Sequence, residues 1–263
     1  MSFKALSFVF NGKPSEAYNL YIMDFDSKSG VSSVVNGANI DVSQEFSARG
    51  STSFLQAVTQ HEPLEFTLKM ASPKKMDRAE MDSISRWLFG HLQPKKLEII
   101  QDDMRGIYYN CFLTNPENLY IDDSGYGFTC DVLCDSPFAY EREKQQVFNT
   151  GGSKKNVIFN NTSSDNDYMR PKIFFKCTKQ GGSVKITNHT DGGSVVEIKD
   201  LDMGEGITMD SKTNIITSTS GKRRLGNTNY TFLKFLPEMN KLTIEGDLDS
   251  LTVIYQNMRK IGG

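Results

Sequence analysis

The second half of the chain consists of short runs in which apolar and polar residues alternate, separated by turn-forming residues. Between Val157 and Tyr255 these runs recur about every eight to twelve residues, with glycine, asparagine or aspartate between them. An alternation of period two puts every second side chain on one face of a strand, so each run can pack against a core. This part of the sequence therefore predicts a β-sandwich without a helix. The expected strands span 157–159, 172–177, 182–188, 194–198, 206–210, 214–219, 230–235, 240–245 and 251–255.

The first half combines strand patterns with one helix. Asp77 and Glu80 have the spacing of a capping box, Ile84 and Trp87 follow at helical intervals, and Gly90 stands where a helix would end. These signals predict a helix near 77–89 that buries the only tryptophan in the core. Strands are expected at 3–10, 17–25, 39–48, 64–70, 96–100, 107–113, 118–121 and 127–133.

A change of composition after Tyr140 predicts a domain boundary. The segment EREKQQVFNTGGSKKN, residues 141–156, is first charged and then rich in glycine and asparagine. The 263 residues suffice for two domains of ordinary size. We expect a mainly β protein with a first domain at 1–141, which contains the one helix, and a second domain at 142–263.

The charge balance excludes some classes of partner. The chain has 30 basic and 32 acidic residues and a formal net charge of −2. A general nucleic-acid or membrane-surface binder would need a basic excess. No run approaches the roughly 18 apolar residues of a membrane span. The first residues, MSFKALSFVF, lack the pattern of a secretory signal, so we expect synthesis in the cytoplasm.

Cys130 and Cys134 have a spacing that could suggest a metal or redox site. On one strand they would share a face but lie about 13 Å apart, beyond the roughly 7 Å limit between the Cα atoms of a disulfide. The three histidines, His61, His91 and His189, are scattered and form no zinc motif with them. The spacing therefore favours two buried, reduced thiols.

No other motif predicts catalysis or cofactor binding. The sequence contains neither a nucleotide-binding glycine loop nor a nucleophile elbow. His189 is expected in a hairpin loop, the pairs at 102–103 and 122–123 are expected to be solvated turn carboxylates, and the basic cluster at 222–224 is expected to be a solvated loop. We therefore predict no catalytic, cofactor-binding or metal-binding residues, and no enzyme.

Three stretches of the first half occur in an order typical of one viral family. They are FVFNGKPSEAYNLYI at 8–22, ISRWLFG at 84–90, and CDVLCDSPFAYE at 130–141; FLPEMNKLTIEG at 235–246 adds a weaker fourth. Asn19 replaces a usual glycine and Ser136 is inserted before Pro137. The chain resembles the distal tail (Dit) proteins of long-tailed phages that infect Gram-positive bacteria.

The resemblance implies a structural role at the tip of the virion tail. It implies an N-terminal belt domain that forms a homo-hexameric ring and a C-terminal galectin-like sandwich. The ring would contact the major tail-tube protein on one face and a tail-associated lysin or tip hub protein on the other, with DNA passing through its lumen. The C-terminal domains would project outward as the expected site for receptor-binding proteins.

The resemblance also implies a role for the stretch at 130–141. The strand ending at Cys134 would be the last of the first domain, and Pro137 would turn the chain outward. Phe138 and Tyr140 would pack at the domain junction.

A carbohydrate-binding adhesion module of the tail tip is the main alternative. Sugar sites stack an aromatic ring on the pyranose, and the second half offers Tyr168, Tyr230 and Tyr255 but no tryptophan. A hydrolase is a third hypothesis, for which the sequence contains no assembled catalytic signature.

Overall fold

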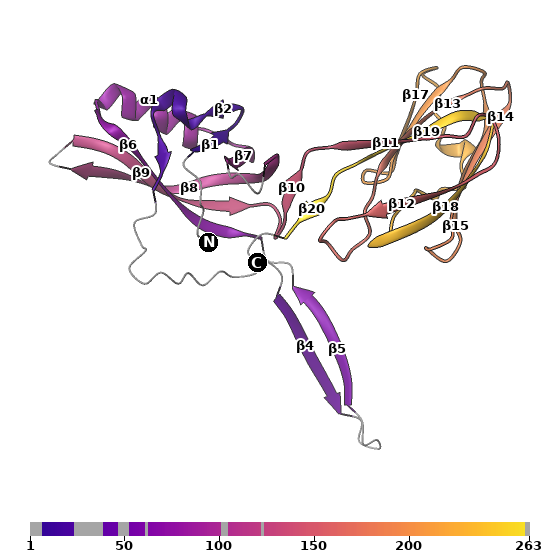
Figure 1. The fold of residues 1–263 in the computed structure, drawn as a ribbon, viewed down its shortest axis with the longest axis horizontal. Helices are drawn as coiled ribbons and strands as arrows, with labels where there is room; N and C mark the ends of the chain where they lie inside the picture. The colour runs from indigo at the N-terminus through magenta and orange to yellow at the C-terminus, as the bar shows by residue number, and fades with distance from the viewer. Residues whose placement is uncertain are drawn as a thin grey trace. The chain divides into compact units, whose positions relative to one another are not determined.

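The structure, a computed structural model, describes residues 7–23, 39–46, 53–60, 63–100, 105–121 and 124–260. The chain separates into two compact units, each with its own hydrophobic core (Figure 1). The first unit comprises Met1–Glu141 with Arg259–Gly263, and the second comprises Arg142–Met258. The division expected from sequence placed all of 142–263 in the second domain, whereas Arg259 groups with the first and forms an ion pair with Glu141.

The first unit is built on an antiparallel sheet. Its strands are β1 (Ser7–Phe10), β2 (Lys13–Pro14), β3 (Tyr21–Ile22), β6 (Glu65–Met76), β7 (Lys95–Ile100), β8 (Ile107–Ile121), β9 (Ser124–Cys134) and β10 (Ala139–Glu141). The two-residue strand β20 (Met258–Arg259) lies where the chain passes from the second unit back to the first. The order in the sheet is β2-β1-β7-β8-β9-β6-β3, with β10 paired to both β8 and β20.

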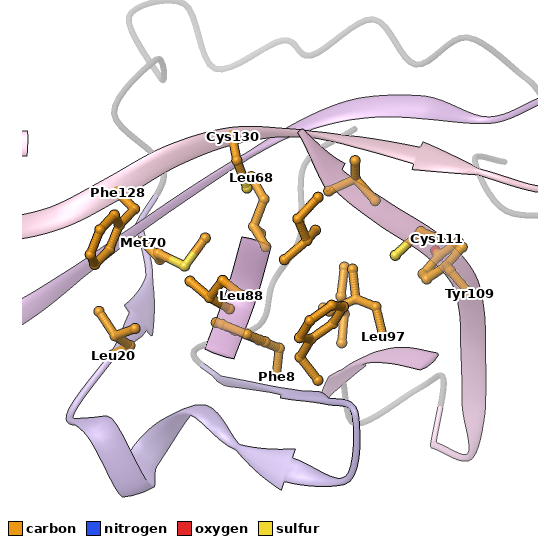
Figure 2. Close-up of a cluster of buried hydrophobic side chains, with 14 of the residues drawn as sticks. Phe8, Leu20, Leu68, Met70, Leu88, Leu97, Tyr109, Cys111, Phe128 and Cys130 are labelled. Atoms are coloured by element: carbon orange, nitrogen blue, oxygen red, sulfur yellow. The ribbon is translucent and has the colours of Figure 1, made fainter. Parts of the chain in front are cut away.

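The predicted helix is α1 (Arg78–Phe89), and the prediction of its capping box is confirmed. The Asp77 carboxylate accepts a hydrogen bond from the Glu80 backbone N–H at 2.8 Å, and the Glu80 carboxylate accepts one from the Asp77 N–H at 2.9 Å. These bonds satisfy N–H groups that the first turn leaves without helical partners. The apolar face of α1, with Met81, Ile84, Trp87 and Leu88, lies in the core that also contains Leu68 and Phe128 (Figure 2).

The expected strand at 17–25 is wrong at its start. Residues Ser15–Tyr18 form a 3₁₀ helix, η1, and the strand shortens to Tyr21–Ile22. The Ser15 hydroxyl is buried and accepts a hydrogen bond from the Phe8 N–H, so this turn packs against β1. Asn19 follows with φ 51°, the left-handed conformation that asparagine adopts more readily than most residues.

Residues 107–121 form one strand where the sequence suggested two. The register of β8 against β9 shifts between Thr114 and Glu117, and Asn115 between them has φ 49°. An irregularity of this kind absorbs extra residues without ending the strand pair. The gap between the two expected strands, residues 114–117, is therefore a bulge within one strand rather than a turn.

A two-stranded hairpin consists of β4 (Asn39–Phe46) and β5 (Ser53–Gln60). The two strands pair along their whole length, from Asn39 opposite Gln60 to Phe46 opposite Ser53. The sequence predicted β4 but not β5. The segment SFLQAVTQ has adjacent apolar residues in place of a clean alternation, so its periodicity did not identify it.

The strand that ends at Cys134 is not the last of the first unit, which corrects the expectation from the resemblance. After the turn at Ser136, β10 pairs with β8. The centroids of the Tyr140 and Tyr108 rings lie 5.7 Å apart. The Ser136 hydroxyl accepts a hydrogen bond from the Phe138 N–H, and Phe138 and Tyr140 are buried. This segment therefore adds a strand to the sheet before the chain leaves the unit.

The second unit is the predicted β-sandwich. Its strands are β11 (Lys144–Asn149), β12 (Lys155–Asn161), β13 (Lys172–Cys177), β14 (Gly182–Asn188), β15 (Ser194–Leu201), β16 (Gly206–Asp210), β17 (Ile215–Ser218), β18 (Glu238–Gly246) and β19 (Leu248–Tyr255). A five-stranded sheet has the order β11-β19-β13-β16-β17 and a four-stranded sheet the order β12-β18-β14-β15. One face of each sheet contributes to a shared core, as the alternating burial of β13 and β14 indicates.

Two expectations for the second unit were wrong. β11 lies within the charged segment at which the domain boundary was placed and where no strand was expected, and it pairs with β19. Conversely, the expected strand at 230–235 is a loop whose Phe235 forms an isolated bridge with Met169. Leu233 and Phe235 are both buried in the core, which explains why they are spaced like residues of a strand. The segment nevertheless forms no ladder of strand hydrogen bonds.

Candidate functional site

The two cysteines at 130 and 134 lie on the buried face of β9. Cys134 is directly opposite Cys111 on β8, and all three thiols are free and buried. Removal from water raises the pKa of the Cys130 and Cys134 thiols to about 12 and raises that of Cys111 as well. Thiols with such pKa values carry almost no thiolate, the reactive and metal-binding form, at neutral pH. We therefore interpret the three cysteines as packing residues.

Trp87 is buried, which confirms its predicted place in the core. Its ring stacks against that of Tyr18 at 4.5 Å between centroids and lies near that of Phe8 at 6.0 Å. The indole N–H donates a hydrogen bond to the Phe10 carbonyl at 3.2 Å. Trp87 therefore joins α1 to η1 and β1, and it is unavailable as a surface platform.

His189 follows β14 in the predicted turn. Its Nε2 lies 2.7 Å from the Thr243 hydroxyl, which donates to the Asn156 side-chain oxygen at 2.8 Å. The aspartates at 102–103 and 122–123 lie outside the described residues. Among the residues that the structure does describe, no group of three or more histidines, cysteines or carboxylates could hold a metal ion.

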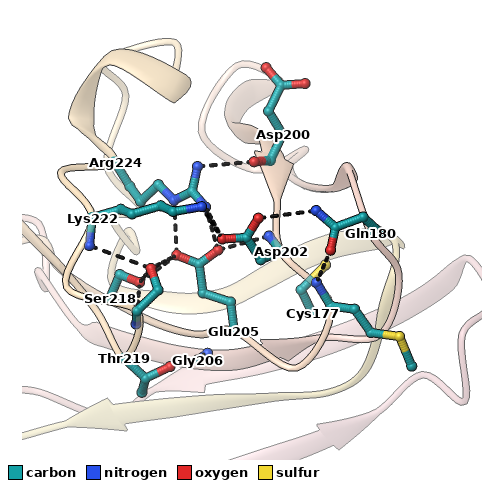
Figure 3. Close-up of polar contacts among 12 residues, drawn as sticks. Cys177, Gln180, Asp200, Asp202, Glu205, Gly206, Ser218, Thr219, Lys222 and Arg224 are labelled. Carbon is teal, nitrogen blue, oxygen red and sulfur yellow. Dashed lines mark hydrogen bonds and ion pairs between the residues drawn. The ribbon is translucent and has the colours of Figure 1, made fainter.

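The basic cluster at 222–224 is not the solvated loop that the sequence suggested, because Arg224 is buried. Its guanidinium donates to both carboxylate oxygens of Glu205, from Nε at 2.8 Å and from Nη2 at 2.6 Å (Figure 3). The side chains of Glu205 and Arg224 are 1% and 7% exposed, so this is a buried bidentate ion pair. Hydrogen bonding from Arg224 holds the pKa of the Glu205 carboxyl well below its ordinary value.

The remaining contacts of this ion pair connect three segments of the second unit. Arg224 also donates to the Asp200 carbonyl and to the Asp202 carboxylate, which Lys222 contacts as well. The Ser218 and Ser220 hydroxyls donate to Glu205. The network fixes the loop after β17 to the turn between β15 and β16. Sequence reasoning missed it because the partners are 19 to 24 residues apart and form no motif.

The loop that continues from Arg224 is held against the edge of β15. Asn229 accepts a hydrogen bond from the Glu197 N–H at 3.2 Å and donates to the Val195 carbonyl at 2.7 Å. The Asn229 backbone N–H also donates to the Glu197 carbonyl. Thr228, the residue before Asn229, forms an isolated β-bridge with Ile198. The segment is thus fixed at both ends although it belongs to no strand.

The three tyrosines considered for sugar stacking differ in exposure and contacts. Tyr255 packs edge-on against the core residue Phe159. Tyr168 donates its hydroxyl to Asp191 at 3.1 Å and lies beneath the Lys234 ammonium. Tyr230, next to Asn229, is 68% exposed and lines an open pocket. Of the three, Tyr230 is the most exposed, whereas Tyr168 and Tyr255 are half-buried.

In the described part of the chain, no helix is long and apolar enough to cross a membrane.

Comparison with known proteins identifies the family. A family model described as the N-terminal domain of a phage tail protein matches residues 3–136, and one described as the phage tail C-terminal domain matches residues 138–255. A search of curated proteins finds no match.

A solved structure identifies the fold. The Dit protein of phage SPP1, described as a paradigm of the hub adsorption apparatus in phages that infect Gram-positive bacteria, aligns with a TM-score of 0.67 at 10% identity. The alignment covers 96% of this chain and 99% of that protein. A chain of the phage P2 baseplate in its activated conformation aligns with a TM-score of 0.49 at 7% identity, over 91% and 90% of the two chains. The protein therefore belongs to a family of phage tail proteins and has the fold of the distal tail, or Dit, proteins.

Proposed function

We propose that this protein is a structural hub at the distal end of a long phage tail, where six copies form a ring between the tail tube and the tip proteins. One observation carries the proposal: the fold of a hub protein matches both units in order and over nearly the full length of both chains. Family membership over both units supports a role in the tail.

The first unit would form the ring. Identical subunits close into a ring through one repeated head-to-tail contact, which requires two complementary surfaces on each copy. Tyr120 and Ile121, at the end of β8, are 61% and 59% exposed in the isolated chain. Consecutive residues of a strand face opposite sides of the sheet, so these two exposed apolar side chains are candidates for contacts on two different surfaces of the unit.

DNA would pass through the lumen without being retained. Each phosphate that a basic side chain neutralises releases counterions and adds affinity, so a conduit with a strong basic excess would hold the DNA. The net charge of −2 is compatible with passage. The ring would thus act as a channel rather than as a nucleic-acid-binding protein.

The two faces of the ring would contact the tail-tube protein and the tail-associated lysin or tip hub. The second unit would project outward and provide attachment for receptor-binding proteins. In this role the protein is no enzyme, and it carries out its function by assembly at the tip of the virion tail.

The interactions can be tested with partners encoded by the same phage. The purified protein, mixed separately with the tail-tube protein and with the tip hub protein, should form a stable complex with each. In negative-stain images the two partners should occupy opposite faces of a ring. If the protein forms no complex with the tail-tube protein, or none with the tip hub protein, at micromolar concentration, the proposed place in the tail is contradicted.

A further inference from the structure

Tyr230 combines an exposed ring with an unfavourable backbone conformation. Its ring is 68% exposed, and its φ is 60°, in the left-handed region. A bulky residue is rare there because its Cβ crowds the backbone, and glycine or asparagine would fit with less strain. The small buried part of the ring does little to offset this strain. Strain retained at an exposed position is a reason to look for a binding role.

The ring of Tyr230 borders a pocket of about 600 Å³ in the second unit. This volume is within the range of small-molecule sites. Arg170, Ser211, Asn214, Leu225 and Thr231 also line the pocket. The lining thus combines an exposed aromatic ring with hydroxyl, amide and guanidinium groups.

The charges around this pocket are compensated. The Arg170 guanidinium lies 3.4 Å from the Asp167 carboxylate. The Lys234 ammonium lies 4.0 Å from the Asp191 carboxylate and 4.4 Å from the centre of the Tyr168 ring. Arg170 and Lys234 both line the pocket, and the carboxylate near each of them partly compensates their positive charge, which weakens the attraction for an anionic ligand. A neutral, polar ligand suits it better.

One polar group in the wall lacks a partner. Ser211 is 4% exposed, and its Oγ has no hydrogen-bond partner among the described residues. Most buried polar atoms are hydrogen-bonded, so an exception in the wall of a pocket is the kind of group that a polar ligand or an ordered water satisfies. The hydroxyl is therefore a second observation, independent of Tyr230, that favours a hydrogen-bonding ligand.

The loop that carries Tyr230 is fixed before any ligand arrives. Asn229 holds it to β15 by three hydrogen bonds, and Arg224 ties its beginning to the buried carboxylate of Glu205. The Tyr230 N–H donates to the Thr228 hydroxyl at 3.1 Å. A platform that is already ordered loses little conformational entropy on binding, which favours affinity.

We propose that this pocket binds a neutral saccharide, with Tyr230 as the stacking platform and the polar wall as the hydrogen-bonding partner. A pyranose ring has an apolar C–H face and a rim of hydroxyls. The exposed tyrosine ring beside hydroxyl, amide and guanidinium groups complements both. The site lies wholly within the second unit and does not depend on ring formation.

Glycan-array binding of the full-length protein, with neutral and acidic oligosaccharides on the same array, tests the proposal. Hits are then confirmed by saturation-transfer NMR. The wild-type protein should bind neutral glycans. Tyr230→Phe should retain binding because stacking does not need the hydroxyl. Tyr230→Gly should weaken binding by about tenfold or more, as expected for removal of a central aromatic anchor.

A second readout separates loss of the platform from loss of the fold. Tyr230→Gly relieves the left-handed strain, so its midpoint of thermal unfolding should stay equal or rise while binding is lost. Met203→Ala, at a residue 71% exposed in the same unit and absent from the pocket lining, should change neither binding nor stability.

Several outcomes would overturn the proposal. These are no binding to any neutral glycan, binding to acidic glycans alone, and unchanged binding by Tyr230→Gly. Cross-linking of the pocket to another tail protein, with no glycan binding, would assign it to a protein partner instead. The proposed hub role is tested separately through ring formation and tail partners, so either idea can fail while the other stands.

Discussion

Trp87 shows how one side chain joins several segments of the first unit. Its ring contacts Tyr18 and Phe8, and its N–H bonds the Phe10 carbonyl, so α1, η1 and β1 meet at one residue. None of these partners is within 60 positions of Trp87 in the sequence, and only the helical spacing indicated that it would be buried. The burial was predictable, whereas the partners were not.

Truncation of Trp87 should strongly destabilise the first unit. Trp87→Ala leaves a cavity and a Phe10 carbonyl without its partner, and the free energy of unfolding should fall by about 3–5 kcal/mol. Denaturant unfolding followed by circular dichroism measures this. Leu92→Ala, at a residue 94% exposed, is the control and should change little. Equal stability of the two variants would show that Trp87 does not support the core.

The four free cysteines should be inert in the folded protein. Burial keeps the pKa of Cys130 and Cys134 near 12, so reaction with a thiol reagent at neutral pH requires opening of the structure. Thiol titration should give almost no reaction in buffer and four thiols in denaturant. Fewer than four thiols in the denatured, freshly reduced protein, or stoichiometric zinc by metal analysis, would contradict the packing role.

The same two cysteines should be replaceable. Buried thiols act as small hydrophobic groups, so Cys130→Ala with Cys134→Ala removes packing without removing an interaction of another kind. Each of the two substitutions should cost an amount within the range of about 0.5–3 kcal/mol that is usual for single substitutions, and the fold should be retained. Circular dichroism with denaturant titration measures it, and an unfolded variant would count against this role.

Elements with a strong local signal were predictable from sequence, and those formed by distant partners were not. The helix was identified from Asp77 and Glu80, whose reciprocal bonds are local. β11 lies in a charged segment, and only its pairing with β19 reveals it as a strand. Residues 230–235 show the reverse case, because Leu233 and Phe235 are spaced like a strand but fill the core from a loop.

The candidate site was less predictable than the fold. Tyr230 was named from sequence as a possible stacking aromatic but was placed in an expected strand at 230–235. Its exposure, its φ of 60° and its pocket follow from how distant segments of the chain meet, which no local pattern indicates. Arg224 was misjudged because an arginine between Arg223 and Leu225 has no local sign of burial. Its partner Glu205 precedes β16, whereas Arg224 follows β17, so two strands separate the pair along the sequence.

The ion pair between Arg224 and Glu205 should make the second unit sensitive to substitution. Glu205→Gln removes the bidentate charge partner of a buried guanidinium, a change that costs about 3–5 kcal/mol when the remaining charge is left uncompensated. Because Arg224 keeps its bond to the Asp202 carboxylate, the loss should lie toward the lower end of that range. Glu245→Gln is the matched control, because Glu245 contacts Lys154 and Lys185 at the surface. Thermal unfolding compares the two variants. A loss no larger in Glu205→Gln than in Glu245→Gln would contradict a structural role for the buried pair.

The same pair predicts a direction of pH dependence. The folded pKa of Glu205 is lowered from its ordinary 4.5, so the unfolded state binds the proton more readily. The stability from this group is therefore present above about pH 4.5 and is lost as the pH falls below it. The wild-type unfolding midpoint should drop between about pH 5 and pH 3 more steeply than that of Glu205→Gln. Parallel pH profiles would contradict this assignment.

The chain divides into two units with separate hydrophobic cores, so the assembly of one can be tested without unfolding the other. If the first unit forms the ring, charges at its exposed apolar positions should prevent assembly without unfolding it. Tyr120→Lys with Ile121→Lys should shift the protein to monomer in size-exclusion chromatography with light scattering. Met203→Lys, at a more exposed residue of the second unit, should leave assembly intact. Normal assembly of the first variant would place the subunit contact elsewhere.

The mass of the purified full-length protein in solution, together with negative-stain images, tests the central claim most directly. The account predicts closed rings with six-fold symmetry and a native mass of about six times the 29.6 kDa of one chain, by the closure of head-to-tail contacts. Tail partners, added if the free protein dissociates at low concentration, should drive the same ring to form. A protein that remains monomeric at high concentration and with both tail partners present would contradict the account.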